Sequence, residues 1–330
     1  PKGRGVIFNI PPRPIGTPLH DNGTYWMRAG ESLVPMDTST LRRICAEAEP
    51  DFSAEICSGS TLDDLMVEAI EVFRRKWIQK SGNNNLSKLS IYELLESAEL
   101  IVDDKVTYAA LILFGSNKAL GKYLANAELI LEYRSSEVSG PAQWRGNFRQ
   151  GFFSYYDLLW DKINQRNDQQ HYQDGLFMVD IWTFNEGAVR ESLLNAVSHR
   201  EYRNPGSIFI SQYSRRIEIV SPGGLPPGIS PSNILDKQLP RNRRLAETFE
   251  KCGLVERAGQ GVNRMFESCI LEGKPLPDFT GTDDYRVALT LQGTIQDPRF
   301  LQFLERIGQE QLASFTTRDL LLLNLSFWNH

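Results

Sequence analysis

The hydrophobic and polar positions of this 330-residue chain follow two periods, which predict two kinds of element. Apolar residues at alternate positions or in short runs indicate strands, and apolar residues that recur every three or four positions indicate helices with one buried face. The predicted strands are residues 6–10, 128–134, 176–182, 207–213, 216–221 and 285–291. The predicted helices are residues 62–77, 90–98, 152–164, 185–203, 241–252, 262–271 and 298–325. Segment 176–182 is almost entirely apolar and is therefore expected to be a buried strand.

Turn and capping residues mark the ends of several of these segments. Asn22-Gly23 lies between two strand-like stretches and is the strongest short signal for a hairpin, so residues 16–35 should form a β-hairpin. Thr61 and Asp64 have the spacing of a helix N-terminal cap, and residues 316–319 repeat this signal near the end of the chain.

The predicted helix 185–203 carries three polar residues in a row. Glu191, Asn195 and His199 are spaced four apart, so each lies about 40° around and about 6 Å along the helix from the one before. A carboxylate one turn before a carboxamide could supply a base for a water molecule and an oxygen ligand for Mg²⁺. A set of solvent-facing or backbone-capping side chains would show the same spacing, so both interpretations stay open.

Two loops with paired glycines follow this helix. The first, Gly223-Gly224, comes directly after a predicted strand, where the lack of side chains would let the backbone approach a ligand closely. The second, Gly259-Gln260-Gly261, comes directly before a predicted helix. Its backbone N–H groups and the positive end of the helix dipole would face one point, which makes this loop a candidate anion site.

A third glycine-containing stretch, Gly115 to Tyr123, does not meet the requirements of a P-loop. Five residues rather than four separate Gly115 from Gly121, and Tyr123 stands where a serine or threonine would hold magnesium. A functional P-loop is therefore not expected, and neither is the motor of a P-loop helicase.

Composition and charge narrow the class of protein. The formal net charge of −5 argues against a protein that coats nucleic acid by bulk charge, although a local basic patch is compatible with it. No apolar run approaches the roughly 20 residues of a bilayer span, and no signal peptide opens the chain, so we expect a cytoplasmic globular protein. The four cysteines include no Cys-x-x-Cys pair, so neither a zinc site nor a disulfide framework is indicated. Because the chain begins at Pro1 and moves at once into a predicted strand, we expect it to be part of something longer.

Motifs along the chain, in a fixed order, resemble those of a known family. They are Glu191 to Asn195, His199-Arg200-Glu201-Tyr202, Ser221-Pro222-Gly223-Gly224-Leu225-Pro226, Arg241-Asn242, and Glu256-Arg257 followed by Gly259-x-Gly261. This order resembles the GHKL ATPase fold of histidine kinases, the gyrase B subunit and MutL. It resembles more closely the "RecG-like" family of transcriptional regulators, in which a Schlafen AlbA-like domain precedes a GHKL-like domain. Residues 7–18 and 25–36 resemble the closing third of that AlbA-like domain.

The resemblance implies the fold class and the domains. The fold would be α/β (α+β), a GHKL-like α/β sandwich with a mixed sheet. The implied domains are the end of an AlbA-like domain (1–47), a connecting α/β region (48–144), a GHKL-like ATP-binding domain (145–292) and a helical C-terminal segment that could lead to a winged-helix domain (293–330).

The resemblance also implies roles for individual residues. Glu191 would be the general base for an attacking water, and Asn195 would be a ligand of Mg²⁺. His199 would either contact phosphate or hold the loop after the helix, and we favour the loop. The residues implied to surround ATP, on its base side or along its phosphates, are Ser221, Gly223, Gly224, Arg241, Arg243, Gly259, Gln260 and Gly261. In the AlbA-like part, Arg13, His20 and Arg28 would contact DNA phosphates, or they are ordinary surface residues.

One residue departs from the family pattern. GHKL proteins recognise adenine through an aspartate at the start of the first glycine motif, where this chain has Ser221. A serine lacks the charge and reach of a carboxylate, so the preference for adenine stays open.

We expect a DNA-associated transcriptional regulator that uses ATP as a ligand or as a slowly hydrolysed switch. Two alternatives remain: a non-enzymatic interaction module with a degenerate nucleotide site, and a Mg²⁺-dependent ATPase coupled to DNA. A homodimer is compatible with each.

Overall fold

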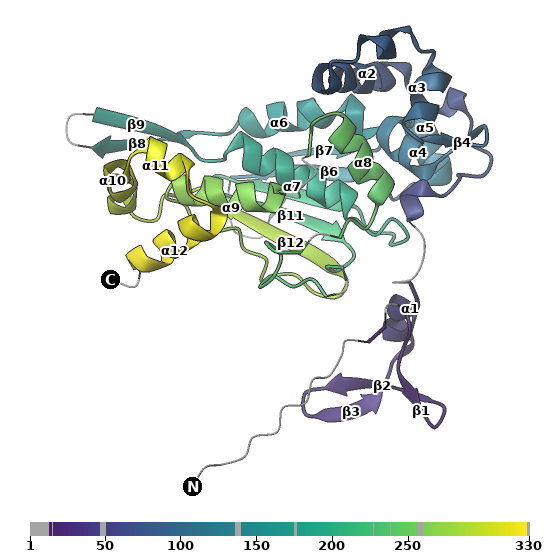
Figure 1. Ribbon diagram of the computed structural model, residues 1–330, viewed down its shortest axis with the longest axis horizontal. Helices are drawn as coiled ribbons and strands as arrows, with labels where there is room; N and C mark the ends of the chain where they lie inside the picture. Colours follow the sequence, from purple (N-terminus) through teal and green to yellow (C-terminus); the bar gives the residue numbers. More distant parts are fainter. Residues whose placement is uncertain are drawn as a thin grey trace. The chain divides into compact units, whose positions relative to one another are not determined.

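The computed structural model describes residues 13–14, 16–46, 51–135, 140–174, 177–226, 228–237, 239–255 and 260–328. The chain divides into two compact units, Pro1–Pro50 and Asp51–His330 (Figure 1). The strand predicted for residues 6–10 lies outside the described residues.

The first unit contains a three-stranded antiparallel sheet and one helix. Its elements are β1 (His20–Asp21), β2 (Thr24–Ala29), β3 (Ser32–Pro35) and α1 (Thr38–Ala46). Asn22 and Gly23 join β1 to β2 with φ angles of 49° and 79°, the conformation that a two-residue hairpin turn requires. Gly30, with φ of 61°, lies in the next reversal and precedes β3. The hairpin predicted for residues 16–35 is confirmed, with a third strand added.

The centre of the second unit is a five-stranded mixed sheet in the spatial order β12-β11-β10-β6-β7. These strands are β6 (Leu129–Arg134), β7 (Trp144–Phe148), β10 (Ile208–Tyr213), β11 (Arg216–Pro222) and β12 (Arg286–Gln292). β10 runs parallel to β6, and the other neighbouring pairs are antiparallel. Helices combined with this mixed sheet confirm the α+β class. The sheet takes strands from both sides of residue 145, and the expected division of this unit into three domains stays a prediction.

Four helices pack against one another beside this sheet. They are α6 (Tyr156–Asn164), α7 (Glu186–Ser198), α8 (Arg243–Lys251) and α9 (Gly261–Leu271). α7 begins where the Asn185 side chain accepts a hydrogen bond from the Ala188 N–H, and it packs against β11, α8 and α9. Its apolar residues Val189, Leu193 and Leu194 are buried, as the helical period predicted. One face of α7 is thereby fixed in the core, and the other is left to line a site.

The region from residue 51 to 123 is mainly helical. Its elements are η1 (Phe52–Ala54), η2 (Leu62–Asp64), α2 (Val67–Ser81), η3 (Asn84–Lys88), α3 (Ile91–Ser97), β4 (Ile101–Val102), β5 (Lys105–Val106), α4 (Tyr108–Phe114) and α5 (Asn117–Tyr123). Thr61 and Asp64 form the predicted cap, but the long helix begins only at Val67. It starts later because the intervening backbone is extended and the Met66 N–H bonds to the Phe114 carbonyl at 2.7 Å. The stretch resembling a P-loop contains α5, which Ser116 caps.

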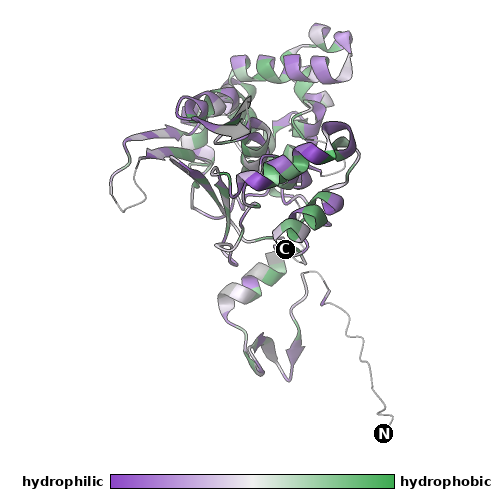
Figure 2. Ribbon diagram, turned by 90° about the vertical axis from the view of Figure 1, so that its left-hand side faces the viewer, coloured by the Kyte–Doolittle hydropathy of each residue, from purple (hydrophilic) through white to green (hydrophobic). Residues whose placement is uncertain are grey.

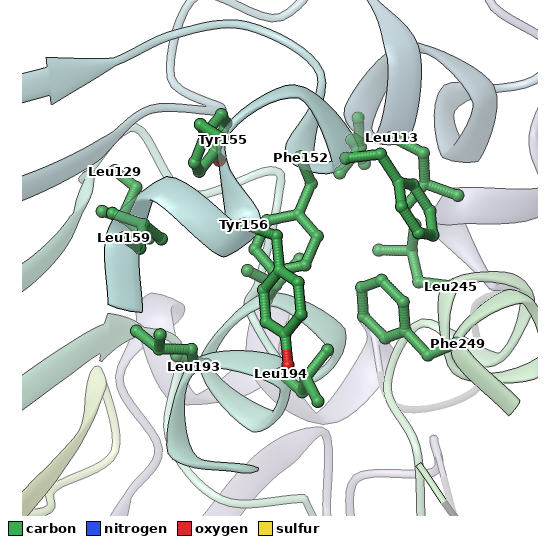
Figure 3. Packing of buried hydrophobic residues seen from close by; sticks show 14 of the residues in the cluster. Leu113, Leu129, Phe152, Tyr155, Tyr156, Leu159, Leu193, Leu194, Leu245 and Phe249 are labelled. Carbon is green, nitrogen blue, oxygen red and sulfur yellow. The ribbon is translucent and has the colours of Figure 1, made fainter. Parts of the chain in front are cut away.

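Aromatic side chains dominate the middle of the core. Phe152, in η4 (Phe152–Ser154), is fully buried, with ring centroids 5.1 Å from Tyr156 and 5.4 Å from Phe249 (Figure 3). Edge-to-face and tilted contacts of this kind add to the free energy of burying the rings. Helices in Figure 2 carry both hydrophobic and hydrophilic residues, as elements with one buried side should.

Two predictions for the second unit need correction. Segment 176–182 forms β9 (Phe177–Trp182), which pairs with β8 (Gln169–Asp174) in a separate two-stranded ribbon, and Trp182 is 46% exposed. The prediction of a buried strand is wrong because an apolar run does not show which sheet it joins. The helix predicted for 298–325 is three helices, α10 (Pro298–Ile307), α11 (Gln309–Ala313) and α12 (Thr317–Trp328). Gly308, with φ of 88°, ends the first, and the predicted cap from Thr316 to Asp319 starts the last.

None of the helices in the described ranges is long and apolar enough to cross a membrane.

Candidate functional site

A cavity of about 520 Å³ opens beside α7. α7, β11, β12, α8, the start of α9 and the segment from residue 224 to 240 supply its walls. The wall formed by the sheet is largely apolar. In the register of β11 with β12, Ile219 lies opposite Leu289, and Ser221 lies opposite Val287. The polar and charged side chains around it are Glu191, Ser192, Asn195, Ser198, His199, Ser221, Lys237, Arg243, Glu247 and Glu250. An apolar chamber with a few polar groups is the usual form of a small-molecule site.

The polar row predicted on the helix lies along one wall of this cavity. Glu191, Asn195 and His199 all line it, and the Asn195 Nδ2 donates a hydrogen bond to Glu191 Oε1 at 2.9 Å. The four-residue spacing therefore predicted the proximity of these three side chains correctly. The roles of Glu191 as a base, Asn195 as a ligand of Mg²⁺ and His199 as a support of the loop stay predictions.

The Glu191 carboxylate also touches the first residue of α9. A Cβ placed on Gly261 would lie 1.7 Å from Glu191 Oε1, so a side chain at this position would displace the carboxylate from the start of α9. The N-terminus of α9 carries partial positive charge and N–H groups that have no partner within the helix, and its N-cap residue Gln260 provides no side-chain cap. The negative charge of the Glu191 carboxylate therefore lies at the positive end of the α9 dipole, where it is stabilising.

His199 is the C-cap of α7 and lies half-buried in the cavity wall. Burial and the nearby positive charge of Arg241 lower the pKa of its imidazole to about 4. The ring is therefore neutral near pH 7 and adds no positive charge for a phosphate. It can still donate or accept one hydrogen bond toward the cavity.

The first glycine loop, Gly223-Gly224, is held in place by contacts with other residues of the protein. Arg241 donates to the Glu201 carboxylate at 3.0 Å and to the Gly224 carbonyl at 2.7 Å. Gly223 has φ of 92°, and a Cβ there would lie 2.5 Å from the Cβ of Glu201. At Gly224 a Cβ would lie 2.7 Å from the carbonyl oxygen of Asp283. Both positions require glycine for packing, and of the two only Gly224 lines the cavity.

Ser221, which stands at the position expected to recognise the base, is 6% exposed and lines the cavity. Its hydroxyl donates to the Ala196 carbonyl of α7 at 2.8 Å. The hydroxyl proton is thus engaged in a hydrogen bond to α7, while the hydroxyl oxygen can still accept a hydrogen bond from a ligand. Ser221 can accept from an amino group of a ligand but cannot donate to a ring nitrogen without breaking its bond to α7.

The remaining predicted residues lie at the edge of the cavity or outside it. Arg243 is at the rim, with an exposed side chain whose Nε donates to Glu247 at 2.7 Å, and this carboxylate raises the pKa of the guanidinium. Arg241 holds the glycine loop instead of facing the cavity. Gln260 is exposed beside the start of α9, and Gly259 lies outside the described residues.

The residues proposed to contact DNA belong to the first unit. Arg13 donates to the carbonyl of Pro14 at 2.9 Å, and Arg28 to that of Gly30 at 3.0 Å. His20 packs edge-on against Tyr25, its partner across the strands. Because side chains alternate along a strand, His20 and Arg28 point to opposite faces of the sheet. Their role as one contact set stays a prediction.

Three charged residues of the cavity were not predicted. Lys237 donates to the Gly228 carbonyl at 3.1 Å, and Glu247 and Glu250 project from α8. Lys237 lies in a long irregular segment without a period, so nothing local marks it. The two glutamates fall one turn apart on a predicted amphipathic helix, where such residues are ordinary surface positions.

The described ranges contain no cluster of three or more His, Cys, Asp or Glu side chains that could hold a metal ion. Mg²⁺ is commonly bound by one or two protein oxygens together with substrate phosphates and water. Glu191 and Asn195 place their side-chain oxygens close together, which fits Mg²⁺ binding shared with substrate phosphates. They are too few to surround the ion by themselves.

Comparison with known proteins finds two family models that match parts of this chain. Residues 206–291 match a family model described as "Putative ATP-dependent DNA helicase recG C-terminal", and residues 42–130 match a domain of unknown function, DUF8451. The first match covers β10, β11, β12, α8 and α9, so this part of the chain is similar to a RecG-like, HATPase-type family. The curated proteins include none with a significant match to the chain.

A solved structure shares the fold. It is the crystal structure of the DIP2311 protein from Corynebacterium diphtheriae, a structural genomics target, with a TM-score of 0.69 and 23% sequence identity. The similarity covers 92% of this chain and 60% of that chain. This chain therefore spans about 60% of the length of that protein.

Proposed function

We propose that the cavity beside α7 binds a nucleoside triphosphate, with ATP as the first candidate, in the GHKL-like domain formed by residues 145–292. The observation that carries the proposal is the meeting of the Glu191–Asn195–His199 row with the glycine start of α9 in one cavity. The HATPase-type similarity of residues 206–291 supports it independently.

The lining of the cavity offers groups for each part of a nucleotide. Ile219, Val287 and Leu289 offer apolar surface for a purine, and the Ser221 oxygen is an acceptor for an amino group. Asn195 and the N-terminus of α9 also line the cavity, and backbone N–H groups at a helix N-terminus attract phosphate. Lys237 and Arg243 at the rim supply positive charge.

Mg²⁺ would be held by Asn195, with Glu191 beside it, and would neutralise phosphate charge when bound. Glu191 is the candidate general base because a water next to its carboxylate would also be near a phosphate seated at α9. Its hydrogen bond from Asn195 holds the carboxylate in one orientation.

The wider role we propose is that of a DNA-associated transcriptional regulator in which nucleotide acts as a ligand or slow switch. Arg13, His20 and Arg28 are the proposed DNA contacts, in an AlbA-like segment ending near residue 47. Because the net charge is −5, we expect weak binding by this chain that falls steeply with salt.

Isothermal titration with ATP or ADP and Mg²⁺ tests the nucleotide site. We expect binding, weakened by Asn195→Ala and unchanged by Asn84→Ala, which alters an exposed amide in η3. No heat of binding from a folded protein at millimolar nucleotide would remove the proposal.

That negative result would favour a non-enzymatic interaction module. Two observations support this second candidate: the Ser221 proton is used by α7, and the Glu191 carboxylate already occupies the end of α9.

A further inference from the structure

One wall of the cavity is formed by residues 225–240, which connect the first glycine loop to α8. Their described part contains no helix or strand, and several of its side chains line the cavity, among them Leu225, Ile229, Ile234 and Lys237. An irregular segment lacks the repeated backbone hydrogen bonds of a helix or sheet. Its position therefore depends on contacts at its two ends and with its neighbours.

The side chain of Arg241 joins the two ends of this wall segment. Arg241 is the residue directly after it, and its Nη2 donates to the carbonyl of Gly224, the residue directly before it, at 2.7 Å. The next residue, Asn242, is 1% exposed and donates through its Nδ2 to the carbonyls of Ser198 and Arg200, where α7 ends. The returning end of the segment is thus anchored on α7, and Arg241 ties the departing end to it.

The carboxylate of Glu201 holds the Arg241 guanidinium in this orientation. One carboxylate oxygen accepts from Arg241 Nη1 at 3.0 Å, and the other accepts from the Arg203 N–H at 3.1 Å. The side chains of Arg241 and Glu201 are 23% and 27% exposed, so the ion pair is largely shielded from water. Charged hydrogen bonds of this kind are stronger than neutral ones, and the arginine fork fixes direction as well as distance.

The glycine loop itself has its N–H groups engaged within the protein. The Gly223 N–H donates to the Tyr285 carbonyl at 2.7 Å, and the Gly224 N–H donates to the Asp284 carbonyl at 3.3 Å. Neither residue of the ion pair lines the cavity. The loop and the ion pair therefore influence a ligand through the place at which they hold the wall, rather than by donating hydrogen bonds to it.

We propose that Glu201 and Arg241 are a positioning pair, which fixes the wall 225–240 and thereby sets nucleotide affinity without touching the nucleotide. A wall held in its binding position before the ligand arrives spares the free energy of ordering it on binding. The proposal rests on the proposed function, because it takes a nucleotide as the ligand of the cavity. It replaces the expectation that Arg241 neutralises phosphate charge.

Titration of Arg241→Met with ATP and Mg²⁺, and with adenosine, distinguishes positioning from phosphate contact. A direct contact with phosphate would weaken ATP binding and leave adenosine unaffected, since adenosine carries no phosphate. A wall that both ligands share weakens both when it is released, and we expect a loss of about tenfold for each, equal within about threefold. Unchanged ATP affinity, or a loss confined to ATP, would overturn the proposal.

Glu201→Gln gives the two explanations opposite signs, and it decides the question if Arg241→Met does not fold or if adenosine binds too weakly to measure. The substitution removes a negative charge near the site, so electrostatics alone predicts tighter ATP binding. It also weakens the hold on Arg241, so positioning predicts ATP binding weaker by about threefold or more. Tighter or unchanged binding is incompatible with a positioning pair.

Arg216→Met is the matched control for the loss of a positive charge. Arg216 lies on β11, the strand that leads into the glycine loop, and pairs with Glu218 at 2.7 Å outside the cavity. Its removal should leave the affinity for ATP within about twofold of the unaltered protein, because a distant charge is screened.

Hydrogen exchange of the ligand-free protein tests the wall independently of the nucleotide. In Arg241→Met the amides of residues 225–240 should exchange at least about tenfold faster, while α7 and β11 keep their rates and Arg216→Met shows no change in the wall. Faster exchange in the wall, together with no nucleotide binding by the unaltered protein, would contradict the proposed function and support the attachment of the wall. Unchanged exchange at 225–240 would overturn the positioning role whether or not nucleotide binds.

Discussion

Glu191→Gln should have opposite effects on folding and on nucleotide binding. The substitution keeps the shape of the side chain and removes its charge. In the structure this charge touches Gly261, the first residue of α9, at the point where a phosphate would be seated. The carboxylate therefore stabilises the protein without ligand and repels the phosphates of a nucleotide.

The size of each effect follows from the contact. A negative side chain at a helix N-terminus contributes about 0.3–1 kcal/mol, and up to about 2 kcal/mol when partly buried. Glu191 is half-buried, so we expect a loss of about 1 kcal/mol, or about 2–4 °C in melting temperature. Two unit charges about 5 Å apart at an effective dielectric constant of about 20 repel by roughly 3 kcal/mol. With allowance for screening, ADP without metal should bind about 10- to 100-fold more tightly to the variant.

Titration of ADP in the presence of EDTA, and again with Mg²⁺, measures this gain, and differential scanning fluorimetry measures the stability. With Mg²⁺ the gain should shrink, because the cation is attracted to the carboxylate. Glu186→Gln is the matched control, since it lies on the same helix, is exposed and pairs with Arg190 at 2.6 Å outside the cavity. If metal-free ADP binds equally to Glu191→Gln, Glu186→Gln and the unaltered protein, the carboxylate is not where phosphate binds.

Other predictions concern the first glycine loop, the pKa of His199 and the rate of ATP hydrolysis. Gly224→Ala should lower the free energy of unfolding by about 2–4 kcal/mol in urea denaturation, because its Cβ would meet the carbonyls of Asp283 and Asp284, whereas Gly121→Ala in α5 should be neutral or stabilising. The pKa of His199 is lowered to about 4 in the folded protein. Between pH 6.5 and 4 its imidazole is therefore protonated in the unfolded chain and neutral in the folded protein. Stability should therefore fall as pH drops through this window, and His199→Gln should remove about 2–3 kcal/mol of that fall; identical pH profiles would contradict the assignment. If the protein hydrolyses ATP, Glu191→Ala should abolish phosphate release while the nucleotide still binds at least as tightly as to the unaltered protein, and unchanged turnover would exclude Glu191 as the base.

The sequence predicted local features of the site well and its long-range contacts poorly. The period of the helix places Glu191, Asn195 and His199 on one wall, since their relation depends only on helix geometry. The contact between Glu191 and Gly261 joins residues 70 positions apart in the chain and depends on how α7 and α9 pack. No local pattern contains that information.

The same limit explains the errors in the fold. The apolar run of β9 predicts a buried strand, but β9 pairs with β8 in a separate ribbon, and the pairing partner is not encoded in a single strand. The start of α2 is set by the bond from Met66 to Phe114, again a contact between distant segments. The hairpin at Asn22-Gly23 was predicted correctly because its turn chemistry is local.

The glycine motifs are weaker evidence for a nucleotide than their order along the chain implies. Gly223 is required by Glu201 and Gly224 by the backbone at Asp283, so a chain that had lost its ligand would still need both, whereas a side chain at Gly261 would meet only the movable carboxylate of Glu191. Features that folding does not require discriminate better. An open apolar cavity of about 520 Å³ leaves lining side chains such as Leu239, which is 48% exposed, without the packing that a ligand or larger neighbours would give. Ala246→Phe, which adds a ring to the cavity wall from α8, should therefore stabilise a ligand-free interaction module but block nucleotide binding in a nucleotide-dependent protein.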